Sequence, residues 1–190
     1  MIIVLEGMPG SGKTTISNFL KNEHSFGMVP QIIETEDGKI EANNKYHQNP
    51  FFRSDELKCQ LARKLEKTHR NVIMDRNYIS TLAYNYAVND KEHHSSFAIA
   101  SQWYLDNIDF NLIYPTIYIY LKTPLKFCFS RKNRQPDIKS PWTNPSCLKK
   151  MSYFYKNIFP LMEIKIPKKT ISTDDTIENV IDQIIKTCSM

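Results

Sequence analysis

The sequence predicts an α/β fold in which a mostly parallel, five-stranded sheet is covered by helices on both faces. Short apolar segments alternate with longer helical patterns along all 190 residues, and polar motifs follow the ends of several apolar segments. In a parallel sheet such ends meet at one edge, where ligands bind. The length favours one domain spanning residues 1–190, and its 41% hydrophobic residues are enough to form a core.

The first half of the chain alternates strands with helices. Leu57, Leu61 and Leu65 recur at helical spacing, with Gln60 and Arg63 on the opposite face, so residues 55–67 are predicted as one helix. By the same criteria the elements in order are a strand at 2–6, a helix at 14–22, a strand at 29–34, the helix at 55–67, a strand at 71–74 and a helix that ends near residue 88.

The second half continues the alternation. A strand is predicted at 116–121, a short helix at 124–129, a loop rich in proline and polar residues through Pro145, and a fifth strand near 169–172. Asp175 and Glu178 form a D-x-x-E capping box at the start of a last helix. That helix carries one apolar stripe, made of Ile177, Val180, Ile181, Ile184 and Ile185.

Charge and cysteine usage narrow the class of protein. The net charge of +5 comes without long Lys/Arg runs, which argues against a nucleic-acid partner and favours phosphate handling. The cysteines contain no C-x-x-C pair, which argues against a zinc site or a disulfide framework and predicts a reducing, cytoplasmic location. No apolar run approaches the ~20 residues of a membrane span, so no membrane partner is expected.

A phosphate-binding loop follows the first predicted strand. Residues 7–14, GMPGSGKT, satisfy G-x-x-x-x-G-K-[ST] in full and open a helix. Backbone N–H groups of such a loop surround phosphate oxygens, Lys13 reaches the outer phosphates, and the Thr14 hydroxyl holds Mg²⁺. The sequence therefore predicts ATP and Mg²⁺ as cofactors, with the nucleotide bound by Gly7, Gly10, Ser11, Gly12, Lys13, Thr14 and Thr15.

An Asp-Arg pair follows the third predicted strand. Asp75 is suited to holding Mg²⁺ or orienting an acceptor, and the fork of Arg76 is suited to a phosphate or carboxylate. The alternative is an N-cap aspartate followed by a surface arginine. In the next helix, Asn77, Ser80 and Tyr84 share a face that fits a sugar or base, or is simply solvated.

Two arginines are candidates for a lid. Arg131 and Arg134 lie three residues apart at the start of a loop, and we expect a lid over about 131–147. Arginines on a closing lid neutralise charge that develops on a transferring phosphoryl group. The alternative is a solvated basic turn.

Three other residues are candidates for the acceptor site, and each could instead be an ordinary surface residue. Glu34, at the end of the second predicted strand, is a general base if the acceptor is a hydroxyl, and otherwise a surface charge. Gln60 and Arg63 either hydrogen-bond a base edge or lie on a solvated helix face.

These motifs resemble the thymidylate kinase and deoxynucleoside kinase group of P-loop kinases, over nearly the whole chain. Residues 75–84, DRNYISTLAY, look like the thymidylate kinase signature D-R-[YF]-x-x-S-x-x-A-Y, with Asn77 in the aromatic position. By this resemblance Arg76 contacts the acceptor's phosphate, and Ser80 and Tyr84 line the nucleotide pocket.

The resemblance also covers the C-terminal half. Arg131 and Arg134 match the family's lid arginines, and residues 172–180 resemble the strand–turn–helix that closes around the donor adenine. Homodimers are common in this group. The chain departs from thymidylate kinases at Pro9, where they usually carry aspartate, and it lacks their T-R-E-P motif, having Glu-Thr-Glu-Asp at 34–37.

The function implied is ATP-dependent phosphoryl transfer to a nucleoside monophosphate, most simply a thymidylate-like one. In this reading Lys13, Asp75, Arg76, Arg131 and Arg134 are the catalytic residues, with Thr14 and Asp75 at the metal. The alternatives are a deoxynucleoside kinase, a kinase of a non-nucleotide small molecule, and, least favoured, a non-catalytic nucleotide switch. A GTPase switch would normally carry a guanine-reading N-K-x-D, which the chain lacks.

Overall fold

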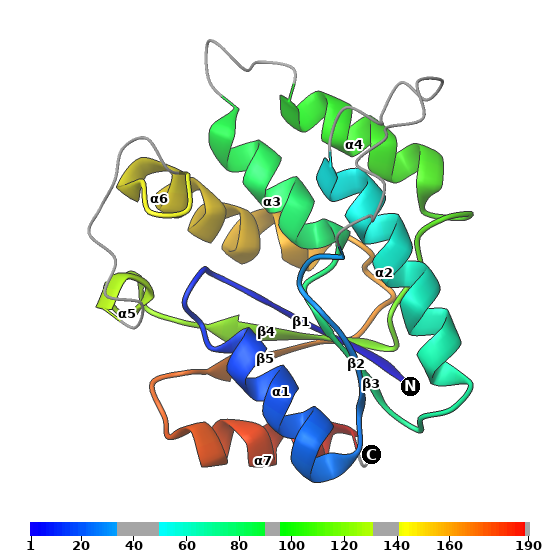
Figure 1. The fold of residues 1–190 in the computed structure, drawn as a ribbon. Helices are drawn as coiled ribbons and strands as arrows, with labels where there is room; N and C mark the ends of the chain where they lie inside the picture. The colour runs from blue at the N-terminus through cyan, green and yellow to red at the C-terminus, as the bar shows by residue number, and fades with distance from the viewer. Residues whose placement is uncertain (34–49, 90–95, 131–140, 189–190) are drawn as a thin grey trace.

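The computed structural model describes residues 1–33, 50–89, 96–130 and 141–188. These residues contain a five-stranded sheet in the order β2-β3-β1-β4-β5, and every neighbouring pair is parallel (Figure 1). The strands are β1 (Ile2–Gly7), β2 (Gly27–Val29), β3 (Val72–Asp75), β4 (Ile117–Lys122) and β5 (Lys168–Ser172). The predicted fold class is therefore confirmed.

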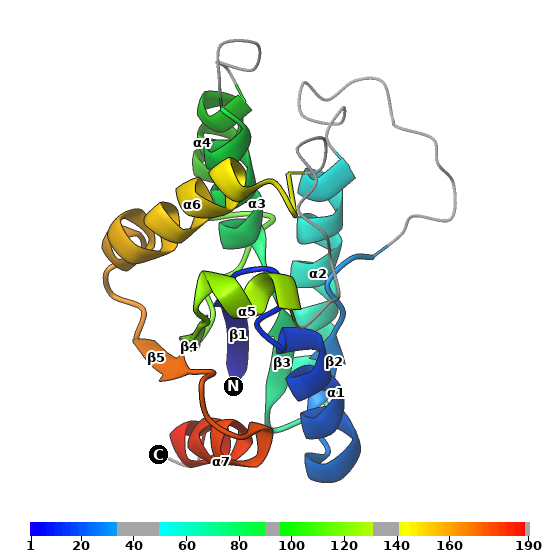
Figure 2. The ribbon, with the colours of Figure 1, turned by 90° about the vertical axis from the view of Figure 1, so that its left-hand side faces the viewer.

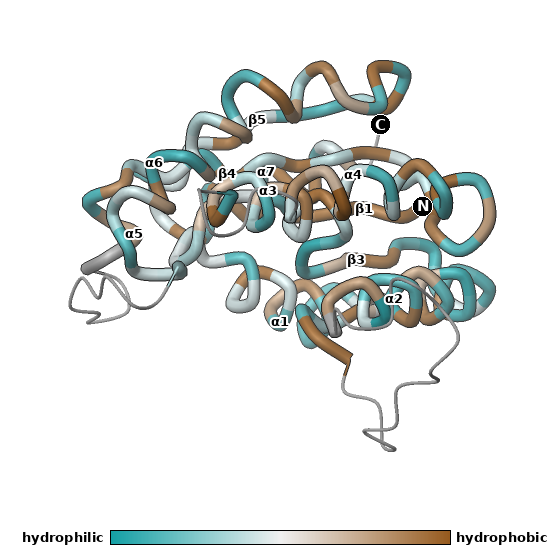
Figure 3. The backbone as a smooth tube through the Cα atoms, turned by 90° about the horizontal axis from the view of Figure 1, so that it is seen from above, coloured by the Kyte–Doolittle hydropathy of each residue, from teal (hydrophilic) through white to brown (hydrophobic). Residues whose placement is uncertain are grey.

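Helices lie on both faces of the sheet, because β1 points alternate side chains to opposite sides. Val4 packs in a core with α2 (Pro50–Glu66), α3 (Tyr78–Val88), α4 (Ser96–Asn107) and α6 (Pro145–Tyr153). Ile3 and Leu5 pack with α1 (Lys13–His24) and α7 (Ile177–Cys188). Figure 2 shows these two layers above and below the sheet, and in Figure 3 β1 and β3 run through the middle as largely hydrophobic segments.

The second strand differs from its prediction. β2 covers only Gly27–Val29, not 29–34, and residues 30–33 have no regular structure. Pro30 explains the early end, because proline has no N–H to donate to a sheet ladder. The segment that follows β2 therefore leaves the sheet at Val29.

Two helices of the structure were not predicted from the sequence. α4 was not predicted, and neither was α6, which begins inside the expected loop and lid. The side chain of Asn144 caps α6 by accepting hydrogen bonds from the N–H groups of Ser146 and Cys147, and Pro145 occupies the first turn. The short α5 (Leu125–Ser130) matches its prediction closely.

The cap of α7 is shifted by one residue from the predicted D-x-x-E box. Thr176 precedes the helix, and its Oγ1 accepts the N–H of Asn179 at 3.3 Å. Asp175 Oδ1 instead accepts from the N–H of Thr176 and from Asn179 Nδ2, and these hydrogen bonds lower the pKa of Asp175. The predicted helix forms, with Thr176 as its N-cap.

After α6 the chain continues through a π-helical turn at Phe154–Ile158 and a 3₁₀ turn at Phe159–Leu161. The π turn buries both Phe154 and Tyr155, which are adjacent in sequence. No helix in the described ranges is both long and apolar enough to cross a membrane.

Candidate functional site

The phosphate loop joins β1 to α1 with backbone angles that favour glycine. Gly10 and Gly12 have φ of 80° and 90°, in the left-handed region. A Cβ on Gly10 would lie 2.8 Å from the carbonyl oxygen of Cys128 in α5. The loop thus requires glycine at position 10 for both its turn and its close approach to α5.

Lys13 is held inside this loop. Its Nζ donates to the carbonyl oxygens of Gly7 and Met8 at 2.9 and 2.8 Å, and to Ser11 Oγ at 2.7 Å. Burial lowers the pKa of Lys13 well below its ordinary value, and the neighbouring Arg76 guanidinium lowers it further. The ammonium is therefore fixed at the loop, where it can contact phosphate oxygens.

A cavity of about 570 Å³ opens in front of the loop, a size typical of small-molecule sites. Thr173 and Asp175, from the segment between β5 and α7, and Val180 of α7 also line it. The nucleotide-binding residues predicted from the loop motif line this cavity, except Gly7: Gly10, Ser11, Gly12, Lys13, Thr14 and Thr15. The arrangement brings the predicted phosphate and adenine segments into one pocket.

Asp75 and Thr14 meet at the sheet edge, because Asp75 ends β3 directly beside Leu5 of β1. Thr14 Oγ1 donates to Asp75 Oδ2 at 2.5 Å. The other carboxylate oxygen, Oδ1, is buried and has no hydrogen-bond partner among the described residues. A hydroxyl beside a carboxylate with spare acceptor capacity fits Mg²⁺, which prefers oxygen ligands and usually takes only one or two from the protein.

Arg76 has a strained backbone and a buried side chain. Its φ of 69° lies in the left-handed region, which costs a non-glycine residue about 1–3 kcal/mol. Nη1 donates at 2.9 Å both to the Gly7 carbonyl oxygen and to Ser80 Oγ, whereas Nε is buried without a partner among the described residues. Such strain is characteristic of functional sites.

Glu6 organises the same region, and the sequence analysis did not include it. Its fully buried carboxylate accepts from the N–H of Asn77 at 3.0 Å, from Ser80 Oγ at 2.6 Å and from Tyr155 Oη at 2.8 Å. Burial raises the pKa of Tyr155 well above its ordinary value, so this phenol stays a donor. The available signal was an acid closing an apolar strand directly before the loop.

The structure shows which residue caps the N-terminus of α3. Asn77 is the N-cap, since its side-chain oxygen accepts the N–H of Ile79 at 3.0 Å. The alternative that Asp75 is only a cap with a surface arginine after it is therefore wrong. Arg76 is in fact only 7% exposed.

A second cavity, of about 150 Å³, lies between α2 and α3. Arg76, Ser80 and Tyr84 line it, as the sequence analysis expected for the acceptor pocket, and Arg76 lines the first cavity as well. The other residues in its wall are Gln31, Ile32, Phe51, Ser54, Asp55, Lys58, Asn77, Thr81 and Trp142.

Gln60 and Arg63 are not in that wall, so their predicted place at a base edge needs correction. Gln60 is exposed, and Arg63 Nη2 donates to the carbonyl oxygen of Leu112 at 2.9 Å. The reason is the orientation of α2, whose buried face carries Phe52, Cys59 and Ala62. Glu34, Arg131 and Arg134 lie outside the described residues.

The comparisons with known proteins agree with this geometry. A family model described as deoxynucleoside kinase matches residues 3–189. The chain belongs to the deoxynucleoside kinase family. Its fold is also shared with the solved deoxyadenosine kinase from M. mycoides with bound dATP, at a TM-score of 0.65 and 18% identity over the full length of both chains.

Two relatives of this family member carry thymidylate kinase names. A protein from Picrophilus torridus, named as a probable thymidylate kinase, is 28% identical over 194 residues, which cover 98% of this chain and 94% of the relative. A protein from Acidianus bottle-shaped virus is 29% identical over 97 residues. That match covers 51% of this chain and 55% of the viral protein, so it spans about half of each.

The depressed pKa of Lys13 predicts the alkaline pH dependence of this deoxynucleoside kinase family member. Raising the pH removes the positive charge that attracts phosphate, and burial makes this happen below about 10.4, the ordinary pKa of a lysine. We expect kcat/KM for ATP, which reports the free enzyme, to fall with rising pH in that range.

The measurement is a pH profile of kcat/KM for ATP, repeated with Cys128→Ser to remove the nearby thiol. The same alkaline limb should remain in this variant. If kcat/KM for ATP falls only at or above the ordinary pKa of lysine, the prediction is contradicted.

Proposed function

We propose that the chain transfers the γ-phosphoryl group of ATP to a nucleoside monophosphate of the thymidylate type. The observation that carries the proposal is Arg76, which lines both cavities and has a buried Nε–H without a partner among the described residues. An arginine between donor and acceptor binds the acceptor's anionic phosphate and keeps the two reacting groups in line.

The donor is held by the residues of the first cavity. Loop N–H groups and Lys13 bind its phosphates, and Thr14 and Asp75 would hold Mg²⁺. When bound, the ion neutralises charge on the β- and γ-phosphates. We assign Arg131 and Arg134 to a lid that stabilises the charge of the transition state. The four cysteines contain no C-x-x-C pair, which suits the reducing cytoplasm, where we place the reaction.

A second candidate is transfer to a deoxynucleoside, and the match to the deoxynucleoside kinase family favours it. A hydroxyl acceptor needs a general base, whereas a phosphate acceptor needs mainly positioning and electrostatic stabilisation. Under this alternative the base is Glu34 or Asp75, whose Oδ1 has no partner among the described residues.

The test is ADP release from Mg·ATP with a panel of nucleosides, nucleoside monophosphates and phosphate-free controls, using Lys13→Ala as the blank. Turnover on thymidylate supports the main proposal and makes Glu34 a surface charge. Turnover on nucleosides alone supports the second candidate. If no nucleoside or nucleotide is used while ATP still binds, the acceptor is a different small molecule and both candidates fail.

A further inference from the structure

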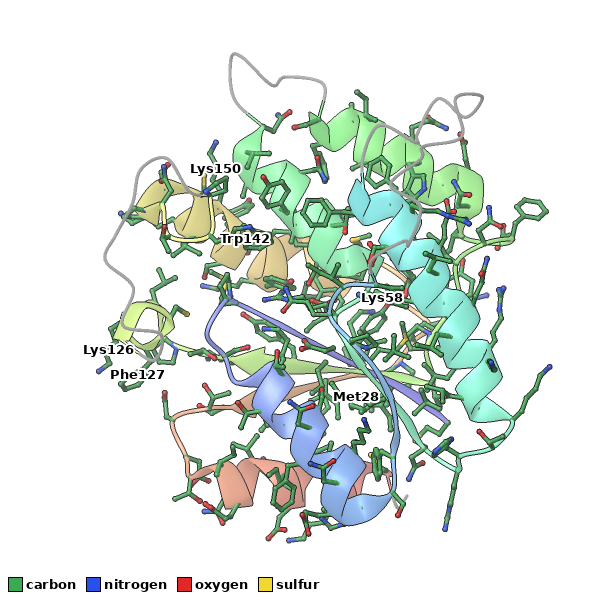
Figure 4. The ribbon with its side chains drawn as sticks, viewed as in Figure 1. Met28, Lys58, Lys126, Phe127, Trp142 and Lys150 are labelled. Carbon is green, nitrogen blue, oxygen red and sulfur yellow. The ribbon has the colours of Figure 1, made fainter. Side chains whose placement is uncertain are left out.

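The inner face of α2 carries a carboxylate and an ammonium that the sequence analysis did not consider. Asp55 is 4% exposed and Lys58 is 1% exposed. Lys58 Nζ lies 3.3 Å from Asp55 Oδ1, and both side chains line the 150 Å³ cavity. In Figure 4 Lys58 lies where α2 runs beside α3. The helix thus presents this pair to the cavity, while Gln60 faces solvent.

The pair has unused hydrogen-bonding capacity. Thr81 Oγ1 donates to Asp55 Oδ2 at 2.6 Å, and burial raises the pKa of Asp55 against the opposing effect of Lys58 and Thr81. Lys58 has three N–H donors and makes one hydrogen bond among the described residues. A buried ion pair adds little stability by itself, so spare donors aimed into a cavity point to a ligand that pairs with them.

The remaining wall of the cavity is aromatic. The rings of Tyr84 and Trp142 stack with centroids 4.9 Å apart and planes at 28°, and the ring of Phe51 lies 5.9 Å from that of Tyr84. Aromatic walls of this kind pack well against flat, planar groups such as a nucleobase. The polar pair and the aromatic wall together suit a nucleobase with one edge facing α2.

The size of the cavity suits a small, single-ring base. A cavity of about 150 Å³ holds one benzene-sized ring. A pyrimidine is a single six-membered ring, whereas a purine adds a fused five-membered ring. The volume therefore favours a pyrimidine.

We propose that Asp55 and Lys58 recognise the pairing edge of a pyrimidine base on the acceptor. The inference rests on the proposed function and names the acceptor class of that site. Asp55 accepts a hydrogen bond from the base and Lys58 donates one, which requires a neighbouring donor and acceptor. A 4-keto pyrimidine supplies N3–H and O4, and a 4-amino pyrimidine supplies N4–H and N3.

The experiment measures kcat and KM for thymidine, deoxycytidine, deoxyadenosine and deoxyguanosine, each as nucleoside and as monophosphate. The variants are Lys58→Met and its matched control Lys64→Met, an exposed lysine on the same helix. We expect Lys58→Met to raise KM for the pyrimidine acceptor about 10- to 100-fold with little change in kcat, because a hydrogen bond to a charged group is lost. Lys64→Met should match the wild type.

A base analogue separates recognition from a structural role. A pyrimidin-2-one acceptor lacks the 4-substituent, and the wild type should use it at least about tenfold less well. If the 4-keto base is preferred, the analogue also lacks the N3–H donor, so Lys58→Met should reduce this loss and the double variant should abolish it. If the 4-amino base is preferred, it should disappear in Asp55→Asn. The double variant Asp55→Asn/Lys58→Met leaves no unpaired buried charge and should show the same loss of discrimination.

The outcomes distinguish this inference from the proposed function. If the enzyme phosphorylates nucleosides or nucleotides but prefers purines, the inference is overturned and the proposed function stands. For a preferred 4-keto base, a Lys58→Met effect that is equal for the normal and the 4-unsubstituted base also overturns the inference. For a preferred 4-amino base, an equal Asp55→Asn effect on the two bases does so. Failure of every nucleoside and nucleotide to accept phosphate overturns both the inference and the proposed function.

Discussion

Arg76→Lys is expected to lower kcat for phosphoryl transfer by about 100- to 1,000-fold while the Kd for ATP changes by less than about threefold. Lysine keeps the charge, but it lacks the planar guanidinium, whose Nη1 donates both to the Gly7 carbonyl oxygen and to Ser80 Oγ. It also lacks the Nε–H that has no partner among the described residues. Steady-state kinetics with the active acceptor and calorimetric titration with ATP measure the two effects.

The matched control for this variant is Arg70→Lys, an exposed arginine ahead of β3. It should leave both constants unchanged. If Arg76→Lys instead weakens ATP binding as much as it slows transfer, Arg76 serves the donor site, and the proposed placing of the acceptor phosphate is wrong.

Asp75→Asn is expected to lower kcat at least about 100-fold and to raise the Mg²⁺ concentration for half-maximal activity about 10- to 100-fold. The physical reason is the loss of a carboxylate charge beside Thr14 Oγ1. Thermal stability should not fall, because Asp75 Oδ1 is a buried, unpartnered acceptor whose desolvation is a cost to folding.

Magnesium titrations of activity and a melting curve without nucleotide test this pair of effects. Asp109→Asn, on an exposed residue after α4, is the control. A variant that melts well below the wild type and keeps the wild-type Mg²⁺ dependence would show that Asp75 has a structural role only.

Much of the fold was predictable because its signals are local. The phosphate loop is a contiguous motif, and β1, β3, β4 and α7 have strong apolar patterns. α4 was missed because it buries only Ala100, Trp103 and Asn107, which is too few for a clear period. The end of β2 depended on Pro30 and on an edge position in the sheet, which local pattern did not indicate.

Only some residues of the site were predictable from the sequence, and α2 shows why the others were missed. Its leucines at 57, 61 and 65 suggested the inner face, but they are only half-buried, whereas Asp55 and Lys58 are almost fully buried. Charged residues are buried only when tertiary partners such as Thr81 satisfy them, and no helical period reports such partners. Glu6 was missed for the same reason, since its donors come from Asn77, Ser80 and Tyr155.

The two cavities are lined by nearly separate parts of the chain. The first is lined by the phosphate loop, α1, the segment between β5 and α7, and α7, and the second mainly by α2, α3 and Trp142, with Gln31 and Arg76 common to both. We therefore expect substitutions on the inner face of α2 to change which acceptor is used without disturbing how the phosphoryl donor is held. Such a division lets substrate preference diverge while the chemistry of phosphoryl transfer is kept.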